Sequence, residues 1–475
     1  MWVTNDSSYV SVPHAAPAAK KRTIAAWALW DWGSASWNAV VTTFVFATWL
    51  MGNSFAPAEL VAQMETDPAA KAQVEAIVAT HNTWLGWAVA AAGVVIALMA
   101  PILGSRADSG GRRKLWLGIN SAAVLAATLA LFFVTPNQDN LSKQVVIGLV
   151  ILAFGNIFFE LASVNYNSML NQISTPANRG RISGIGWGAG YLGGIVLLVI
   201  LFVGFVNIGD GAGWFGVTSD EGLNIRVAML FAGLWWLIFA LPVFFAIPEK
   251  PSSEKHKPLG IIGSYKKVGS DIAKLWRTDR NVLRFLFASA IFRDGLAGVF
   301  AFGGIIAATS FGFSSGQVIL FAILANVISG LATILFGFIE DAVGAKKVIV
   351  VSLVGMIVSA LVVFGFHSTG QMVFWIFGSI LCIFVGPVQS ASRSTVSRLA
   401  RPETEGELFG LYAMTGRVVS FLAPALYGVM ISIFGRQIYG ILGISIVLLV
   451  GLILVWPLRL DKDRTEVGAH APTAA

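Results

Sequence analysis

Twelve runs of predominantly apolar residues divide this chain of 475 residues, and each run is long enough to cross a lipid bilayer. About 20 apolar residues in helical conformation span roughly 30 Å of hydrocarbon. Backbone amides in lipid must bond within their own segment, so the runs are predicted to be helices. They lie at about 24–52, 82–104, 115–135, 145–170, 181–206, 226–247, 282–308, 316–339, 346–366, 371–397, 406–434 and 437–458. The sequence therefore predicts an all-α membrane protein with twelve transmembrane helices.

Composition and charge agree with this prediction. Only 12% of the residues are charged, whereas soluble domains carry about 25%. With a cytoplasmic amino terminus, 25 of the 32 Lys and Arg residues fall on the cytoplasmic side. Only Lys71, Lys143, Arg226 and Arg436 fall on the other side. This positive-inside asymmetry predicts that both termini are cytoplasmic, and it explains the net charge of +7 without a nucleic-acid partner.

The loop between the second and third runs has a counterpart between the eighth and ninth runs. The two copies read Gly104-x-x-x-Asp108-x-x-Gly111-Arg112-Arg113-Lys114 and Gly337-x-x-x-Asp341-x-x-Gly344-x-Lys346-Lys347. The turns after the fourth and tenth runs also repeat, as Pro176-x-x-x-Gly180 and Pro402-x-x-x-Gly406. Two repeated pairs indicate a duplicated unit, so we expect two pseudo-symmetric bundles of six helices.

These boundaries divide the chain into five parts. They are a cytoplasmic tail at 1–23, an N-terminal six-helix bundle at 24–247, a cytoplasmic linker at 248–281, a C-terminal six-helix bundle at 282–458 and a tail at 459–475. In the linker, Ile261, Tyr265, Val268, Ile272 and Trp276 recur at helical spacing and predict an amphipathic helix on the membrane surface. A short surface helix is also expected in the acidic outer loop at 53–81.

Polar side chains inside the runs are the candidate solute and ion sites, because an ionisable group at hydrocarbon depth is costly unless it faces protein or water. The first run has a polar stripe of Asp31, Ser34, Asn38 and Thr42 along one helix face. Asp31 lies about two turns from the helix end, so an interfacial position is an alternative to a functional one.

The fourth run carries a similar stripe of Asn156, Glu160 and Asn167. Glu160 lies near the middle of its span, where a carboxylate needs a cation, a proton or a wet surface. A structural ion pair is the alternative explanation. On either interpretation, Glu160 is expected to face the interior of the protein.

The second half adds Arg293 and Asp294 in the seventh run, Gln389 and Arg393 in the tenth, and Arg417 in the eleventh. Arg393 is close enough to the cytoplasmic end to extend its side chain into the headgroup region instead. The intramembrane charges balance as three acids and three bases. This balance predicts internal ion pairs, which line a cavity or form a static network.

The duplicated loop resembles the loop signature of the major facilitator superfamily of transporters. The resemblance implies that Asp108 and Arg112, with Gly104 and Gly111, gate the cytoplasmic side. Asp341 belongs to the second copy, which lacks the Arg pair, so its gate is expected to be weaker. A carboxylate in such a loop can accept charge-assisted hydrogen bonds from Arg side chains or from the positive end of a neighbouring helix.

Further motifs run through the chain from about 24 to 458. They are Trp27-Ala-Leu-Trp-Asp31-Trp-Gly-Ser34, Asn165-Tyr-Asn-Ser-Met-Leu170, Asp294-Gly with Phe300-Ala-Phe-Gly-Gly304, and Phe409-Gly-Leu-Tyr412 with Ser420-Phe-Leu-Ala-Pro424. Together they resemble the branch of the superfamily that contains the autophagy-related vacuolar amino-acid effluxer and its bacterial relatives. This resemblance implies a central cavity lined mainly by helices 1, 4, 7 and 10.

The resulting hypothesis is a secondary transporter that moves an amino acid or a similar small polar solute by alternating access, with efflux and proton coupling expected. Glu160, together with Asp31 or Asp294, would carry a proton or meet an ammonium group. Arg293 or Arg417 would meet a carboxylate. The alternatives are a cation-coupled sugar symporter and a membrane scaffold or receptor without transport.

No metal-ligand or nucleophile spacing and no phosphate-binding G-x-x-x-x-G-K-[ST] loop is present in the sequence. We therefore expect neither enzymatic activity nor a cofactor or bound metal. The expected partners are the solute, the lipid bilayer and protons. The expected form is a monomer in the bacterial inner membrane, or in an organelle membrane if the source is eukaryotic.

Overall fold

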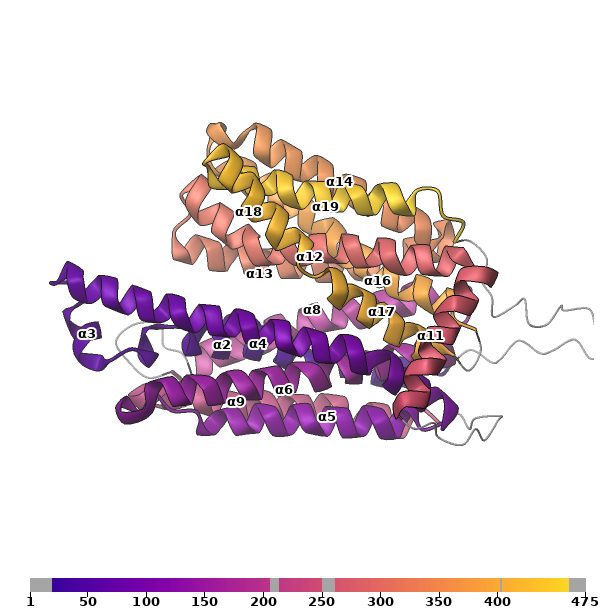
Figure 1. Ribbon diagram of the computed structural model, residues 1–475, viewed down its shortest axis with the longest axis horizontal. Coiled ribbons are helices and arrows are strands. Elements are labelled where there is room, and N and C mark those ends of the chain that lie inside the picture. The colour runs from indigo at the N-terminus through magenta and orange to yellow at the C-terminus, as the bar shows by residue number, and fades with distance from the viewer. Residues whose placement is uncertain (1–18, 206–212, 250–260, 402–403, 461–475) are drawn as a thin grey trace, which may run out of the picture.

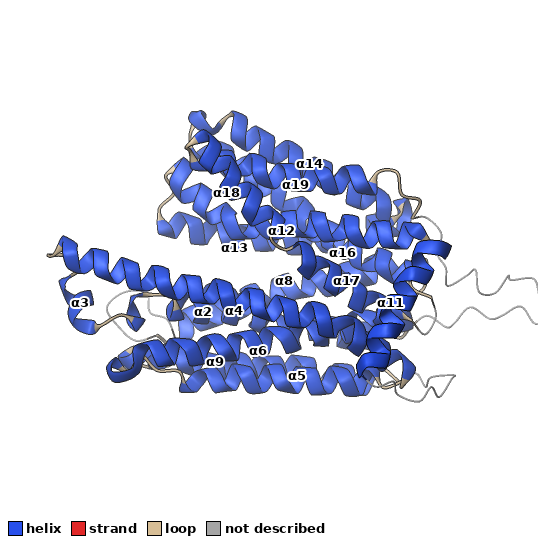
Figure 2. Cartoon of the chain, in the orientation of Figure 1, coloured by secondary structure: helices blue, strands red, loops and turns tan. Residues whose placement is uncertain are grey.

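The computed structural model describes residues 19–205, 213–249, 261–401 and 404–460 of the chain. Within these residues every regular element is a helix, and no strand is present (Figure 2). Eleven helices in this part of the chain are long and apolar enough to cross a membrane. The expected all-helical membrane fold is confirmed. Residues 1–18 and 461–475 of the expected tails, and 250–260 of the linker, lie outside the described residues.

The N-terminal half contributes six spans. In chain order they are α1 (Lys21–Ala35) with η1 (Ser36–Phe44) and α2 (Phe46–Leu50), α4 (Pro68–Ser109), α5 (Arg113–Ala130), α6 (Leu141–Ser168), α8 (Arg179–Gly204), and α9 (Leu223–Ala240) with α10 (Pro242–Ala246). Short connecting elements are η2 (Asn53–Phe55), α3 (Ala58–Gln63), η3 (Leu131–Phe133), η4 (Gln138–Asn140), α7 (Leu170–Ile173) and η5 (Asp220–Gly222). The Trp-rich start of the chain packs into the apolar core of this half, with Trp27, Trp30 and Trp37 fully buried.

The C-terminal half repeats the arrangement. Its spans are α12 (Arg280–Phe311), α13 (Ser315–Val343), α14 (Ala345–Gly365), α15 (Gln371–Val373) with η7 (Phe374–Gly378) and α16 (Ser379–Leu399), α17 (Glu405–Val419) with α18 (Leu422–Phe434), and α19 (Gly440–Val455). The turns η6 (His367–Thr369) and η8 (Gln437–Tyr439) connect them, and α11 (Ile261–Thr278) precedes them.

The first span is not the single α-helix that the sequence predicts over 24–52. From Ser36 to Phe44 the backbone is π-helical, and the Val45 N–H continues this pattern by bonding the Val40 carbonyl at 3.1 Å. Such a bond joins residues five apart, so each π-turn holds one residue more than an α-turn. Side chains beyond η1 are therefore shifted by one position on the helix face.

Helix α4 begins at Pro68, well before the expected start at residue 82. Asp67 caps it by accepting a hydrogen bond from the Ala69 N–H at 2.8 Å, and proline at the first helical position needs no donor. A helix of 42 residues rises about 63 Å, twice the hydrocarbon thickness. Its first turns therefore project beyond the membrane beside α3 (Figure 1). These turns and α3 are the surface helices of the outer loop.

The two halves lie side by side and meet at the end of the molecule that carries α11 (Figure 1). Helix α4 packs along α17, and α8 packs along α13, so each contact pairs one helix from each half. Towards the opposite end the two sets of helices diverge (Figure 1). The arrangement is the twelve-helix fold expected from the duplicated loop. We call the end where the halves meet the α11 end.

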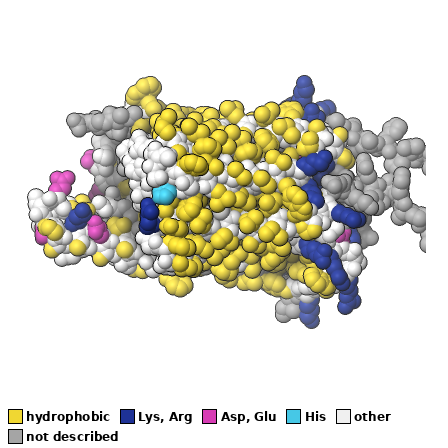
Figure 3. Space-filling model, turned by 90° about the horizontal axis from the view of Figure 1, so that it is seen from above, with side chains coloured by type: hydrophobic (Ala, Val, Ile, Leu, Met, Phe, Trp, Pro, Cys, Tyr) yellow, Lys and Arg dark blue, Asp and Glu magenta, His cyan; other side chains and the backbone are white. Residues whose placement is uncertain are grey.

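The surface is divided along the same axis. Hydrophobic side chains form a broad band around the middle of the visible face, and Lys and Arg side chains gather at the α11 end (Figure 3). Most visible Asp and Glu side chains lie at the opposite end (Figure 3). An apolar band between two polar ends is the surface of a multi-pass membrane protein.

Helix α11 contacts α4 and α12 and so touches both halves. Val268 is buried, and Ile272 and Leu275 are partly buried against the apolar core. Tyr265 and Trp276 are 43% and 56% exposed, although both belong to the predicted apolar face. The middle of that face therefore packs on protein, and its two ends remain open to lipid or water.

Candidate functional site

A cavity of about 600 Å³ lies between the two halves. Its walls come from α1, η1, α6 and α8 on one side and from α12, α13, α16 and α17 on the other. Thr43, Phe44 and Phe374 line it towards the end where the halves diverge, away from α11. A volume of this size accommodates a small organic solute.

The structure brings seven of the ten candidate binding residues to this cavity. They are Asp31, Asn38, Glu160, Asn167, Arg293, Gln389 and Arg393. Trp187 and Tyr191 of α8 line it as well. Asn156, Asp294 and Arg417 are not part of the lining. The polar stripe of the first span continues with Thr43 rather than the expected Thr42, because η1 shifts the later side chains by one position.

Glu160 of α6 forms an ion pair with Arg417 of α17, so this pair joins the two halves. Both side chains are about a quarter exposed. Arg417 is not among the residues that line the cavity, so this candidate binding residue contacts the cavity only through its partner Glu160. The pair compensates both charges at hydrocarbon depth.

Asp31 of α1 pairs with Arg393 of α16 across the same interface, at 3.0 Å. Asp31 is therefore not an interfacial residue, and Arg393 does not extend towards the headgroups, since its side chain is only 3% exposed. Asn167 accepts a further hydrogen bond from Arg393 at 3.2 Å. Both residues for which the sequence left two positions open thus lie in the protein interior.

Arg293 has no ion-pair partner among the described residues. Its guanidinium lies 3.8 Å from the Tyr412 ring centroid and donates to the Tyr412 carbonyl at 3.1 Å. Asp294, the next residue, points elsewhere and accepts the Ala423 N–H at 2.6 Å, at the start of α18. It caps the helix that restarts after the break at Ser420 and Phe421. The cavity wall therefore presents one uncompensated cation.

At the α11 end, Asp108 ties α4 to α17. Arg113 donates to its Oδ1 from Nε at 2.9 Å and from Nη2 at 2.6 Å. The same Nη2 bonds Glu405 at 2.6 Å, and the Glu407 N–H donates to Asp108 Oδ2 at 2.8 Å. The Arg residue that faces Asp108 is thus Arg113, whereas the expected Arg112 is exposed. We call these contacts the first gate.

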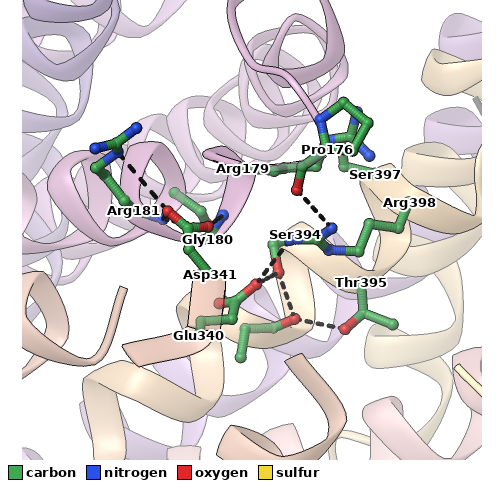
Figure 4. Close-up of polar contacts among 12 residues, drawn as sticks. Pro176, Arg179, Gly180, Arg181, Glu340, Asp341, Ser394, Thr395, Ser397 and Arg398 are labelled. Atoms are coloured by element: carbon green, nitrogen blue, oxygen red, sulfur yellow. Dashed lines mark hydrogen bonds and ion pairs between the residues drawn. The ribbon is translucent and has the colours of Figure 1, made fainter. Parts of the chain in front are cut away.

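The second gate is the pseudo-symmetric counterpart. Asp341 at the end of α13 accepts the Gly180 N–H at 2.8 Å and the Arg181 N–H at 3.3 Å, both at the start of α8. Its carboxylate forms an ion pair with the Arg181 guanidinium at 3.7 Å, and Figure 4 shows this pair. In each gate the loop aspartate of one half caps a helix of the other half, where the helix dipole favours a negative charge.

Beside the second gate lies Glu340, which is 1% exposed. Ser394 donates a hydrogen bond to it, and Arg398 lies 3.7 Å away (Figure 4). Arg398 also donates to the Pro176 carbonyl at 3.0 Å, in the turn that precedes α8. A second buried charge group thus links the repeated proline turn of the first half to α16 of the other.

The glycines of the duplicated loop and of the repeated proline turn have two separate roles. Gly104 and Gly406 face one another where α4 crosses α17, and a Cβ at either position would collide with the opposing backbone or with Asp108. Gly111 and Gly344 have φ of 59° and 90°, which favours glycine. The first pair permits close approach of the halves, and the second permits the turn.

Lys267 of α11 adds a link at the same end. It donates to Ser105 of α4 at 3.1 Å and to Glu407 of α17 at 2.6 Å, and it pairs with Asp271 at 3.0 Å. Burial lowers the pKa of Lys267, but its bonds to Glu407 and Asp271 outweigh burial and raise the pKa above its ordinary value. Lys267 therefore keeps the positive charge of this link at neutral pH.

Sequence reasoning did not single out Arg113, Glu340, Glu405, Glu407, Lys267 or Arg398 as functional. Their signal was weak, since charged residues at the ends of membrane spans are explained by topology alone. The repeated proline turns were recognised as traces of duplication. The structure shows that the helices after them are the ones that the loop aspartates cap.

Two six-helix halves around a central cavity that contains a few charged side chains, closed at one end by crossed helix caps, define a membrane transporter of the major facilitator superfamily. Residues 19–468 match the family described as vacuole effluxer Atg22 like. The chain belongs to this family. Both the superfamily and the branch expected from the sequence motifs are thereby confirmed.

Individual relatives are distant. An uncharacterised MFS-type transporter of Bacillus subtilis, YxiO, is 23% identical over 433 residues, which cover 90% of this chain and 93% of YxiO. Autophagy-related protein 22 of Cryptococcus neoformans is 22% identical over 64% of this chain, and the match spans only 56% of the fungal protein.

Among solved structures, the proton:xylose symporter XylE bound to 6-bromo-6-deoxy-D-glucose superposes with a TM-score of 0.66. The superposition covers 94% of this chain and 98% of XylE at 14% sequence identity. At that identity the similarity concerns the fold alone.

Proposed function

We propose that the chain moves a small solute with both a carboxylate and an ammonium group, such as an amino acid, by alternating access. The observation that carries the proposal is the uncompensated Arg293 in a cavity whose other charges are paired across the interface. A carboxylate of the solute would neutralise the positive charge of Arg293. The planar guanidinium can donate two parallel hydrogen bonds to a carboxylate.

The orientation of the chain follows from its charges. Lys and Arg gather at the α11 end (Figure 3). By the positive-inside rule this end, with both termini, faces the cytoplasm. The described conformation is then closed to the cytoplasm and open to the opposite side, and the expected cytoplasmic gates are closed. Efflux would require these gates to open so that the solute can enter.

Proton coupling is assigned to Glu160. When the halves separate at the α11 end, the pair of Glu160 with Arg417 has to loosen, because the two residues lie on different halves. A carboxylate without its cation at this depth needs another cation or a proton. The membership in a family described as vacuole effluxers supports efflux as the direction.

Transport by the purified protein in liposomes tests the proposal. Radiolabelled amino acids should exchange across the membrane, and an imposed pH gradient should drive net accumulation that a protonophore abolishes. Absence of exchange for every amino acid, together with accumulation of a sugar, would reject the amino-acid assignment in favour of the sugar symporter. That alternative has one supporting observation, since Trp187, Tyr191 and Tyr412 line the cavity and could stack on a sugar ring.

Arg293→Ala is expected to lower the apparent affinity for the amino acid by about 30-fold or more, because breaking one side of a buried charge pair costs about 2–5 kcal/mol. Arg293→Lys should recover only part of this loss, since lysine lacks the planar fork. An amine that resembles the amino acid but lacks its carboxylate should compete for transport equally well in all variants. Arg436→Ala, an exposed cation at the opposite end, is the control and should transport normally. Equal affinity in Arg293→Ala and the unaltered protein would exclude Arg293 as the carboxylate partner.

A further inference from the structure

The side chain of Arg393 occupies a pocket that belongs entirely to the other half of the molecule. Arg393 comes from α16, whereas all the groups around its guanidinium come from α1, α6 and α8. The polar contacts are Asp31 at 3.0 Å, Asn167 at 3.2 Å, the Ser183 hydroxyl at 3.0 Å and the Ser183 carbonyl at 2.6 Å. The aromatic contacts, measured to the ring centroids, are Trp27 at 4.7 Å, Trp187 at 5.5 Å and Tyr166 at 5.9 Å.

Trp27, Trp187 and a carboxylate around one cation, with Tyr166 stacked against Trp27 and Trp30, form the kind of cage that binds organic ammonium groups. We call Trp27, Asp31, Tyr166 and Trp187 the aromatic cage. Trp27, Tyr166 and Asp31 hold one another in place without Arg393. The Trp27 and Tyr166 rings stack at 4.5 Å, the Trp27 indole donates to the Tyr166 carbonyl, and the Tyr166 hydroxyl lies 2.9 Å from Asp31. This core of the cage is therefore preformed in the first half of the molecule.

Close packing keeps the cage small. A Cβ at Gly186 would lie 2.6–2.8 Å from the Trp27 ring, from Arg393 and from Asp31, so any other residue would intrude on the cation. The indole N–H of Trp187 is buried without a hydrogen-bond partner among the described residues. A solute with an acceptor next to its cation could satisfy this donor.

Opening of the α11 end must empty the cage. Arg393 travels with α16, while the cage stays with α1, α6 and α8. Asp31 then loses its cation inside the membrane, where an unpaired carboxylate is costly. Another cation has to replace Arg393. A proton would neutralise Asp31, but it would leave the Trp27 and Trp187 rings without the positive charge with which they interact favourably.

We propose that the aromatic cage is the binding site for the ammonium group of the solute, which Arg393 occupies in the described state and vacates when the α11 end opens. The proposal rests on the transport function proposed above and assigns one half of the solute to specific residues. The cage borders the central cavity, because Asp31, Tyr166 and Trp187 are part of its lining. Arg393 thereby competes with the solute for one site.

The test uses tetramethylammonium chloride as the probe and calorimetric titration of the purified full-length protein. Arg393→Ala removes the internal occupant, so this variant should bind tetramethylammonium at least about tenfold more tightly than the unaltered protein, or about 1.4 kcal/mol. Adding Asp31→Asn or Trp27→Leu to Arg393→Ala should remove the gain. Sodium chloride and 2,2-dimethyl-1-propanol serve as salt and shape controls, and Arg436→Ala should bind as the unaltered protein does.

A second measurement leaves the cage and Arg393 intact. Asp108→Asn combined with Asp341→Asn weakens both gates, and tetramethylammonium binding should then appear with Arg393 in place and disappear with Asp31→Asn. Absence of binding in both Arg393→Ala and the gate variant would overturn the proposal. So would binding that is indifferent to Asp31 and Trp27, or proton uptake by Asp31 without binding of the probe. Cation binding without amino-acid transport in liposomes would keep the cage and reject only the solute proposed above.

Discussion

Replacing Glu160 with glutamine is expected to abolish proton-driven accumulation while the protein remains folded. Glutamine keeps the size and an oxygen acceptor for Arg417, so the contact between the halves persists in weaker form. It carries no titratable proton and no charge. Because position 160 then carries no proton, uptake driven by a pH gradient should fall by at least about tenfold, to the level seen without a gradient.

A variant that lacks both charges distinguishes an effect on transport from an effect on stability. Glu160→Gln combined with Arg417→Gln removes both charges, so no unpaired cation remains in the membrane. The melting temperature of the double variant should return towards that of the unaltered protein, but accumulation should stay lost. Exchange of solute without a pH gradient should continue in both variants. A double variant that accumulates solute normally would show that the ion pair has only a structural role and that another residue carries the proton.

Weakening the gates is expected to shift the protein towards the state that is open at the α11 end. Asp108→Asn loses the ion pair with Arg113 and weakens the cap on the Glu407 N–H. Each such loss is worth about 1.5–3 kcal/mol, or roughly a 10- to 100-fold change in the equilibrium between the two states. Asp341→Asn should have a smaller effect, because the ion pair of Asp341 with Arg181 is longer, at 3.7 Å, than that of Asp108 with Arg113, at 2.6 Å.

Alkylation of a buried thiol reports this shift. Cys382→Ser removes the single natural cysteine, and Ser397→Cys places a thiol that is fully buried at the α11 end in the described state. Maleimide labelling should be slow on this background, at least about tenfold faster with Asp108→Asn, and fastest when Asp341→Asn is added. Arg112→Ala is the matched control and should leave the rate unchanged, since its side chain is exposed. Equal rates in all variants would mean that these carboxylates do not hold the α11 end shut.

The architecture was predictable because hydrophobic length and the repeated loop report it directly. The boundaries depend on local signals, and those were partly overlooked. Asp67 followed by Pro68 is a helix start, yet the acidic segment around it suggested only an outer loop with a short surface helix, separate from the second span. The π-helix in the first span has no simple sequence signature, and it moves Thr43 into the position that an α-helix would give to Thr42.

The site was predictable to the extent that charge in the membrane implies burial. Sequence placed Glu160 and Arg417 inside the membrane span and left an interfacial position open for Asp31 and Arg393. It could not pair these charges, because each pair joins helices far apart in the chain. Adjacent residues can also differ in burial. Arg113 is buried in the first gate while Arg112 is exposed, since a turn beginning at Gly111 decides which of them faces Asp108. Tertiary packing determines which of the two side chains is buried.

The role of Asp294 also depends on tertiary packing that the sequence does not show. Its depth in the membrane suggested a solute or proton site, whereas the structure uses it to cap α18 after the break in the eleventh span. The break itself was within a recognised motif, since Ser420 and Pro424 flank the restart of the helix. Sequence alone does not show that a carboxylate on one helix caps the start of another helix, because that requires knowing that the two helices pack together.

Alternating access itself is tested most directly by two distances measured in the same protein. Spin labels at Gly110 and Lys347, both exposed, report the separation of the halves at the α11 end, and labels at Asp139 and Ser368 report the opposite end. Double electron–electron resonance in liposomes should show the first distance lengthening and the second shortening when Asp108→Asn and Asp341→Asn are introduced on the Cys382→Ser background. Two distances that stay fixed, or that change in the same direction, would contradict the account of one cavity that opens to either side in turn.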